Sequence, residues 1–521
     1  MQNNKSDVLI IGAGGAGLVA ALHAHENGMK VRVLTKEYPT RSQTCMAQGG
    51  INAALGNAGE DATESHVQNT LKSANGLASE VEIRRLCENA PEAVAWLDSI
   101  GVCFSRTKDS KIAQRALGGA SASRACYAQD YTGLKILHTL YDRCLACGIE
   151  ILNEKFLLEV LKNGNKACGV EVLDIRSGVK EVYSAKAVIL ATGGYSRVYA
   201  KNSTNATAST GDGIAIALKA GAKVSDMEFV QFHPTGLKSS SILISESARG
   251  AGGYLLNSKG ERFIDELKPR DIVSRAINDE MLKGEEIFLD IRHLGEAFID
   301  AQLPQERKLA KLYENVDPVH DLIPVKAVAH YTMGGIDVND TTSTCVDGLF
   351  ACGECANHSV HGANRLGGNS LLELVVFGKL AGESAALYAQ DKSYLHVEVM
   401  SKEEATKEIQ VDFYKVREEL GELFYKDVGI VRDKKTLEKT LEKVNSFLEQ
   451  TSQMGVKDTS HVYNTNRIEF LEFQNTLAVS KMILLGAIAR DESRGAHFRS
   501  DKPQKDENYS KHTLQDLQGV L

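Results

Sequence analysis

The sequence lacks an excess of basic residues and a long apolar run. Its 60 lysines and arginines are outnumbered by 68 aspartates and glutamates, giving a formal net charge of −8. This balance gives no electrostatic basis for binding nucleic acid or an anionic membrane surface. The most apolar stretch, SLLELVVFGKLAG at 370–382, is interrupted by Glu373 and Lys379, so it falls short of the ~18 residues of a membrane span. We predict no nucleic-acid partner and no direct membrane insertion.

Closely spaced clusters of metal-binding cysteines are also absent. Of the ten cysteines, only Cys144 with Cys147 and Cys352 with Cys355 form CxxC pairs, and these pairs lie about two hundred residues apart. We therefore predict no metal site and free thiols in a reducing cytoplasm. The opening MQNNKSD leads directly into a predicted strand, so no signal peptide is expected.

The sequence does contain a nucleotide-binding pattern at its start. DVLIIGAGGAGLVAALHAHENGMKVRVLT, at 7–35, predicts strand, helix and strand, with GAGGAG at 12–17 in the turn. Glycines there let backbone N–H groups approach a pyrophosphate and let the helix pack on the strand. The second strand ends in Thr35 and Lys36, with Glu37 one step later, whereas NAD sites more often place an acidic residue at its end. The pattern therefore favours FAD.

The remaining pattern predicts further domains, as expected for 521 residues. Buried strands are predicted at 186–190 and 348–354, short strands at 252–257 and 262–265, and a helix at 272–282. Charged stretches with opposite charges four residues apart predict exposed helices at 401–424 and 434–450.

Eight motifs occur in the order found in one flavoprotein family. They are KEYPTRSQTCMAQGGINAAL, ATGGYSRVY, TGDG, EFVQFHPTG, PRDIVSRAI, AHYTMGGI, HGANRLGGNSLLELVVFG and ESRGAHFRSD. Through them the sequence resembles the flavoprotein subunits of fumarate reductase and succinate dehydrogenase over nearly its whole length. The resemblance implies an α/β Rossmann-like FAD-binding domain (1–230 and 331–395), an inserted α+β capping domain (231–330) and a C-terminal all-α helical domain (396–521). Residues 231–330 are called the cap segment below.

The same resemblance implies FAD as the cofactor. In most membrane-complex members of the family, a histidine follows the Arg-Ser pair of the KEYPTRSQTCMAQGGINAAL motif and binds the flavin covalently. This sequence has Gln43 at that position. An amide cannot form that linkage, so we predict non-covalent FAD with a lower potential that favours fumarate reduction. The residues implied to bind FAD are Gly12, Ala13, Gly14, Gly15, Ala16, Gly17, Thr35, Lys36, Ser42, Gln43, Thr44, Ala47, Gly49, Gly50, Lys155, Phe156, Ala191, Thr192, Gly193, Asp212, Tyr331, Glu354, Arg365, Ser370 and Leu371.

The substrate implied by the resemblance is a small dicarboxylate, fumarate or succinate. The residues that match the family's carboxylate-binding positions are His233, Ser245, His330 and Arg365, and Glu246 and His233 are predicted to take part in both binding and catalysis. Arg270 matches the proton donor, and Glu246 with Arg249 matches the relay that returns its proton. A buried ion-pair network is the structural alternative for these three residues.

Alternative functions remain open at this point. An L-aspartate oxidase would place a glutamate where this sequence has Leu117, and an apolar side chain would leave the substrate ammonium unpaired. A non-catalytic electron-transfer subunit would not need Arg270 and His330, and a ketosteroid or 2-oxo acid reductase would not need the carboxylate-binding set. The resemblance implies an iron–sulfur subunit and a membrane-anchor subunit as partners, with the protein at the inner face of the cell membrane. A soluble electron donor would also fit, because the cap segment is shorter than in the familiar membrane complexes.

Overall fold

The structure, a computed structural model, describes residues 4–395 and 409–521. Its largest sheet has seven strands: β1 (Lys5–Ile11), β2 (Val31–Thr35), β6 (Glu150–Asn153), β7 (Lys155–Asn163), β8 (Lys166–Asp174), β9 (Lys180–Leu190) and β16 (Leu349–Ala351). Their order is β6-β2-β1-β9-β8-β7, with β16 also paired to β9. Strands β6, β2, β1, β9 and β16 are parallel, whereas β8 and β7 are antiparallel additions.

Helices cover both faces of this sheet, because alternate side chains of a strand point to opposite sides. Val8 and Ile10 of β1 belong to one core, and Leu9 and Ile11 belong to the other. The first core includes α1 (Gly15–Glu26), α2 (Thr63–Ala74), α3 (Glu80–Glu88), α4 (Ala90–Ser99), α5 (Thr132–Ala146) and α11 (Asn369–Gln390). The second includes α6 (Asp212–Lys219), α12 (Phe413–Asp427), α13 (Lys434–Gln450) and α14 (Thr465–Ala489). The strand, helix and strand expected at 7–35 are thus β1, α1 and β2.

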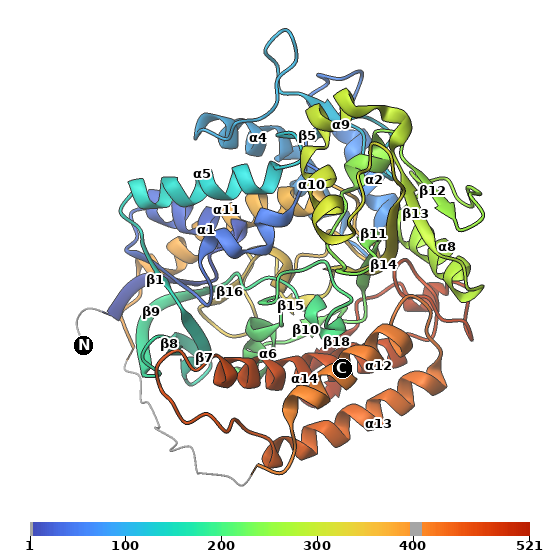
Figure 1. The fold of residues 1–521 in the computed structure, drawn as a ribbon. Helices are drawn as coiled ribbons and strands as arrows, with labels where there is room; N and C mark the ends of the chain where they lie inside the picture. The colour runs from blue at the N-terminus through green and yellow to red at the C-terminus, as the bar shows by residue number, and fades with distance from the viewer. Residues whose placement is uncertain (1–3, 396–408) are drawn as a thin grey trace.

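The cap segment forms most of a separate antiparallel sheet with its own apolar core. In Figure 1 this part lies beside the large sheet, and it touches the C-terminal helices where the Tyr425 hydroxyl donates to the Ala327 carbonyl oxygen at 2.8 Å. Its strands, in spatial order, are β11 (Val230–Leu237), β14 (Ile323–Thr332), β13 (Ile287–Asp290) and β12 (Tyr254–Asn257). Its helices are α7 (Glu246–Gly250), α8 (Arg270–Leu282), α9 (Glu296–Gln302) and α10 (Pro304–Tyr313).

The C-terminal region is helical, as expected, and its last residues return to the body of the molecule. There β18 (Leu514–Asp516) and β19 (Gly519–Val520) extend a five-stranded sheet that also contains β10 (Val224–Ser225), β15 (Gly335–Asp337) and β17 (Ala356–Asn357). A three-stranded sheet is formed by β3 (Ile51–Asn52), β4 (Gln114–Arg115) and β5 (Ala125–Cys126). No helix among the described residues is long and apolar enough to cross a membrane.

Two expected elements differ from the sequence pattern. The strand expected at 262–265 is wrong, because Arg262 makes only an isolated bridge with Leu256 and its side chain turns back to Glu266, with Nη2 2.7 Å from Oε2. The helix expected at 401–424 begins only at Phe413, where the Asp412 side chain accepts a hydrogen bond from the Tyr414 N–H and caps it. Residues 401–408 of that prediction lie outside the described residues.

Candidate active site

One continuous cavity collects almost all the predicted site residues. It has about 1620 Å³ of empty space, part of it open to solvent, and extends from the glycine-rich turn of α1 to the cap segment. The predicted residues that line it are Gly12, Ala13, Gly14, Gly15, Ala16, Thr35, Lys36, Ser42, Gln43, Thr44, Ala47, Gly49, Gly50, Lys155, Phe156, Ala191, Thr192, Gly193, Asp212, His233, Ser245, Glu246, Arg270, His330, Tyr331, Glu354, Arg365, Ser370 and Leu371. Gly17 and Arg249 are the two predicted residues outside this lining.

The glycine-rich turn is shaped by close backbone contacts. Gly12 has φ +111°, and a Cβ on it would lie 2.2 Å from the Ala191 carbonyl oxygen. A Cβ on Gly17 would lie 2.0 Å from the Gly12 carbonyl oxygen, which explains why Gly17 packs under the turn and does not line the cavity. The first turn of α1 contains no acidic side chain, so its positive end favours an anion in the cavity.

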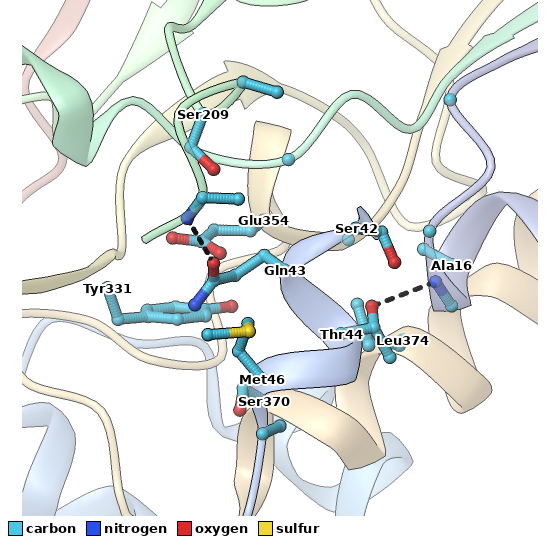
Figure 2. A pocket seen from close by; sticks show the side chains of 18 of the residues that line it. Ala16, Ser42, Gln43, Thr44, Met46, Ser209, Tyr331, Glu354, Ser370 and Leu374 are labelled. Atoms are coloured by element: carbon cyan, nitrogen blue, oxygen red, sulfur yellow. Dashed lines mark hydrogen bonds between the residues drawn. The ribbon is translucent and has the colours of Figure 1, made fainter. Parts of the chain in front are cut away.

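The segment expected to bind the flavin forms a short helical turn, Gln43–Met46. Figure 2 shows the Gln43 amide directed into the cavity near Tyr331, Glu354 and Met46. Its Oε1 accepts a hydrogen bond of 2.7 Å from the Ala206 N–H. Gln43 therefore connects this turn to the segment that precedes α6.

Two buried hydroxyls in the cavity wall give a test of cofactor fit. Ser42 and Thr192 line the cavity, and neither side-chain oxygen has a hydrogen-bond partner among the described residues. Buried hydroxyls without partners are costly, and both lie near the helix N-terminus that favours an anion. The residues present therefore fit a dinucleotide with a pyrophosphate, as FAD has.

At the cap end, two histidines face each other across strands β11 and β14. The rings of His233 and His330 have centroids 4.9 Å apart. His233 Nδ1 accepts from the Thr235 N–H at 3.2 Å, and His330 Nδ1 is 2.8 Å from Thr204 Oγ1. Since both Nδ1 atoms contact the protein, Nε2 is the atom that each ring can present to the cavity.

Both histidines are neutral at physiological pH. Burial lowers the pKa of His233 and of His330 well below the ordinary value, and the positive charge of Arg270 lowers both further. A neutral imidazole can donate one hydrogen bond to a carboxylate without adding a charge. Net positive charge at this end of the cavity therefore comes from arginine.

Arg365 is buried and poorly satisfied by the protein. Its guanidinium carbon lies 4.3 Å from the centroid of the Tyr331 ring, its Nη1 reaches the Leu366 carbonyl oxygen only at 3.5 Å, and its Nε has no partner among the described residues. Burial and Arg270 lower the pKa of Arg365 to about 10, which leaves it charged at neutral pH. A buried cation with open donors is the arrangement expected for binding an anion.

Arg270 begins a buried chain of charged groups. Its Nη2 lies 2.5 Å from Glu246 Oε2, and its Nη1 donates to Gln231 Oε1 at 3.0 Å. Glu246 Oε1 is 3.6 Å from Arg249 Nη2. Burial by itself would raise the pKa of Glu246, but the positive charges of Arg270 and Arg249 outweigh this effect and keep it ionised. Arg270 and Glu246 are thus hydrogen-bonded, whereas Arg249 lies behind Glu246 at ion-pair distance and its Nη2 has no hydrogen-bond partner among the described residues.

Sequence reasoning missed two residues that hold this site in place. Gln231 is fully buried, and besides accepting from Arg270 it donates to the Arg365 carbonyl oxygen at 2.8 Å. Thr204 orients His330 from a distant loop. Gln231 stands in the EFVQFHPTG motif two positions before His233, but its partners appear only in the fold, and no local pattern indicated Thr204.

Leu117 lines the cavity between Gly49, which is predicted to bind FAD, and Ser245, which is predicted to bind the substrate. Its Cδ1 would lie 3.7 Å from a Cβ placed on Gly49, and the Ser245 hydroxyl would lie 3.9 Å from the same point. This wall is therefore apolar at the position where the aspartate oxidase alternative requires a carboxylate.

Three of the four CxxC cysteines, Cys144, Cys352 and Cys355, are buried, whereas Cys147 is partly exposed. The Cys144 thiol donates to the Leu18 carbonyl oxygen at 3.6 Å, and the Cys355 thiol donates to the Leu190 carbonyl oxygen at 3.3 Å. Burial raises the pKa of both thiols, to about 12 and about 11. These cysteines are thus uncharged packing residues.

Comparison with known proteins identifies the site's relatives. The family described as FAD binding domain matches residues 7–371, and the family described as fumarate reductase flavoprotein C-term matches residues 417–519. The chain is 41% identical to the 8-methylmenaquinol:fumarate reductase flavoprotein subunit of Wolinella succinogenes, over 98% of this chain and 88% of that protein. It is 39% identical to a succinate dehydrogenase flavoprotein subunit of Rickettsia bellii, over 98% of this chain and 93% of that protein. The solved structure of a quinol-fumarate reductase with menaquinol molecules superposes with a TM-score of 0.93 at 36% identity, covering 99% of this chain and 96% of that chain.

Proposed function

Because this chain belongs to the family of fumarate reductase and succinate dehydrogenase flavoprotein subunits, we propose that it reduces fumarate to succinate in the cavity between the large sheet and the cap segment. It is an FAD-dependent oxidoreductase that acts on a CH–CH group. The observation that carries the proposed substrate is the convergence of Arg365, His233 and His330 with the Arg270–Glu246 pair in one buried space.

The dicarboxylate is held by one cation and several neutral donors. Arg365 supplies the charge, while His233, His330 and the Ser245 hydroxyl supply hydrogen bonds to the two carboxylates. Donors fixed in a cavity that excludes water act more strongly on developing negative charge than donors in solution. This arrangement stabilises the charge that forms on the substrate when its double bond is reduced.

FAD, when bound, supplies the hydride that is added to one carbon of fumarate. Arg270 donates a proton to the other carbon, so that one hydride and one proton convert fumarate to succinate. Arginine is a very weak acid, but proton transfer from it becomes feasible toward a carbanion and with immediate reprotonation. Glu246 and Arg249 return the proton along the chain of contacts described above, and Gln231 holds the guanidinium in line.

FAD is held without a covalent bond. Gln43 occupies the position of the histidine that is linked to the flavin in most membrane-complex relatives, and its amide has no comparable nucleophilic nitrogen. The lower flavin potential expected without that link favours fumarate reduction over succinate oxidation. Acid precipitation of the flavin-loaded chain tests the attachment, since non-covalent flavin is recovered in the supernatant and covalent flavin stays with the pellet.

The lining residues indicate which of them would hold each part of FAD. Ser42, Thr44 and the glycine-rich turn would hold the pyrophosphate, Thr35, Lys36, Lys155 and Phe156 would hold the adenosine half, and Ser370, Leu371 and Tyr331 would hold the isoalloxazine. Asp212 and Glu354 would bind ribose or ribityl hydroxyls. An iron–sulfur subunit and a membrane-anchor subunit are the proposed partners, which would place the chain on the inner face of the cell membrane.

The deciding experiment is anaerobic reoxidation of a reduced viologen by fumarate, catalysed by the purified flavin-loaded chain. Arg270→Gln is expected to reduce turnover by about 10²–10⁴-fold, the usual contribution of a positioned proton donor. The matched control is Arg275→Gln on the same helix, because Arg275 pairs with Asp271 at 3.0 Å and with the Gly495 carbonyl oxygen at 2.9 Å.

The outcomes separate the alternatives. Turnover that survives Arg270→Gln would remove Arg270 from the reaction. Absence of turnover in a flavin-loaded wild-type chain would contradict fumarate reduction, and oxidation of L-aspartate with oxygen would then be tested. Failure with both substrates would favour a non-catalytic electron-transfer subunit.

A further inference from the structure

The ammonium group of Lys36 is buried where three segments of the chain meet. It lies 2.7 Å from Asp212 Oδ2 and 2.6 Å from Glu472 Oε1, and it also contacts Thr210 Oγ1 at 3.1 Å and the Ala208 carbonyl oxygen at 3.0 Å. An ammonium group has only three N–H donors. Four acceptors therefore saturate Lys36, and none of its hydrogen bonds is left for a ligand phosphate.

Helix α14 contributes directly to this junction. Asn475, one turn after Glu472, donates its Nδ2 to Asp212 Oδ1 at 2.9 Å, and Thr476 donates to the Thr210 carbonyl oxygen at 3.3 Å. Figure 1 shows α14 running along α6, below the edge of the large sheet that carries β7 and β8. Both carboxylate oxygens of Asp212 are thus bonded to protein donors, one to Lys36 and one to Asn475.

The junction lies at one particular end of the cavity. Lys36 directly follows β2, and in this fold the end of the second strand faces the ribose of the adenosine half of a dinucleotide. Lys36, Asp212 and Phe156 line the cavity, and the Lys36 ammonium lies 5.8 Å from the centre of the Phe156 ring. Glu472 and Asn475 lie outside the lining, behind Lys36 and Asp212.

We propose that Glu472 and Asn475 of α14 are positioning residues for the adenosine half of FAD and act through Lys36 and Asp212. The C-terminal helical region then completes the cofactor site and does not merely cover the sheet. This inference rests on the proposed placement of FAD in the cavity.

The charges around Lys36 explain why its ion pair with Glu472 matters for the binding of FAD. Burial alone would lower the pKa of Lys36, but Asp212 and Glu472 outweigh it and raise the pKa. The ammonium is therefore charged and is fixed between two carboxylates from different segments. Without Glu472, the Lys36 ammonium keeps three acceptors but only one of its two carboxylate partners, and the residues after β2 lose their ion pair with α14.

The proposal is tested by measuring the equilibrium binding of FAD and of FMN to the flavin-free chain by flavin fluorescence. Glu472→Gln is expected to raise the dissociation constant of FAD about tenfold and to leave that of FMN unchanged, since FMN lacks the adenosine half. Asn475→Asp, which places a carboxylate beside Asp212, is expected to show the same FAD-specific loss. The matched control is Glu469→Gln, one turn earlier on α14, where Glu469 Oε2 accepts from the Tyr414 hydroxyl at 2.6 Å.

The comparison of FAD with FMN distinguishes positioning from general destabilisation. An unchanged FAD affinity in Glu472→Gln, an equal loss for FMN, or an equal loss in Glu469→Gln would overturn the proposal. If Glu472→Gln fails to give a thermal unfolding transition, Asn475→Asp alone decides, by the same criteria. Because no turnover is measured, failure of the proposed fumarate reduction would leave this result unaffected.

Discussion

Glu354 is a carboxyl group whose ionisation depends on its position in the cavity wall. Its Oε1 accepts from the Thr332 N–H at 3.0 Å and from the Thr332 hydroxyl at 3.1 Å. Burial nevertheless raises its pKa from 4.5 to about 7, against the opposing effects of Thr332 and Arg365. In the folded flavin-free chain this side chain therefore retains its proton at a pH where the unfolded chain has lost it.

That shift predicts a pH-dependent stability. The folded state binds more protons than the unfolded state between pH 4.5 and about 7, so the contribution of Glu354 is fully present below pH 4.5 and is lost as the pH rises through 7. The loss is on the order of 2 kcal/mol, after allowing for water in the open cavity. Thermal unfolding of the flavin-free chain should show a smaller decline between pH 5 and 8 for Glu354→Gln than for wild type.

A surface glutamate provides the control for this measurement. Glu88 lies exposed near the end of α3, so Glu88→Gln is expected to follow the wild-type curve. If wild type and Glu354→Gln decline in parallel, the carboxyl of Glu354 does not have the raised pKa.

The sequence identified most of the chemistry-bearing residues of the candidate site, because short motifs carry them. Arg270, Glu246 and His330 lie in recognisable stretches, and the structure brings them to one cavity. Gln231 and Thr204 were missed, because their importance comes from the partner each one reaches across the fold. Their side chains resemble ordinary buried polar residues until those partners are known.

The N-terminus of α10 shows how an element of the cap segment is held against the body of the molecule. Helix α10 begins at Pro304, and its preceding residue, Leu303, has no capping side chain. Asp130 takes that role from 175 residues away, with Oδ2 accepting from the Gln305 N–H at 2.6 Å. The Glu306 side chain in turn accepts from the Ser245 N–H at 3.1 Å, so the contact extends to a predicted substrate-binding residue.

Removal of this distant cap is expected to loosen the cap segment. Asp130→Ala should destabilise the chain by about 1–2 kcal/mol, the usual cost of losing an N-cap carboxylate. Hydrogen exchange should increase in α10 and at Ser245 more than in α5. Asp142→Ala, at an exposed position of α5, is the control, and equal protection of α10 in both variants would contradict the role of Asp130.

Element types were predictable where periodicity or composition was strong. The region 7–35 and helix α13 follow their sequence patterns closely. The expected strand at 262–265 is wrong, because only Arg262 of that segment pairs with another strand residue, Leu256, in an isolated bridge. The boundaries of the predicted domains, at 230, 330 and 395, stay predictions.

At the scale of the whole molecule, the large sheet and the C-terminal helices share one core. Leu9 and Leu190 of the sheet belong to the same apolar cluster as Phe424 of α12, Val444 of α13 and Leu477 of α14. The cap segment has a separate cluster. The sheet and the C-terminal helices should therefore unfold as one unit.

A truncation tests this shared core. A chain ending at residue 408 would expose one face of the sheet and remove the strand that pairs with β10, and large apolar areas exposed to water are strongly destabilising. It is expected to show no cooperative thermal transition and no FAD binding. The control ends at Asp516, which keeps β18 and removes only β19. A cooperative transition in the shorter chain would show that the two parts fold independently.

The sequence alone indicated the family, the βαβ start and many of the residues that line the cavity, since motifs and periodicity are local properties of the chain. It also showed that Gln43 replaces the linking histidine. Only the tertiary structure revealed that Lys36 is saturated by Asp212 and Glu472, that Gln231 bridges Arg270 and the backbone of Arg365, and that Asp130 caps α10. These contacts join residues far apart in sequence, and a buried charge or an unpaired helix end does not specify in advance which distant group will satisfy it.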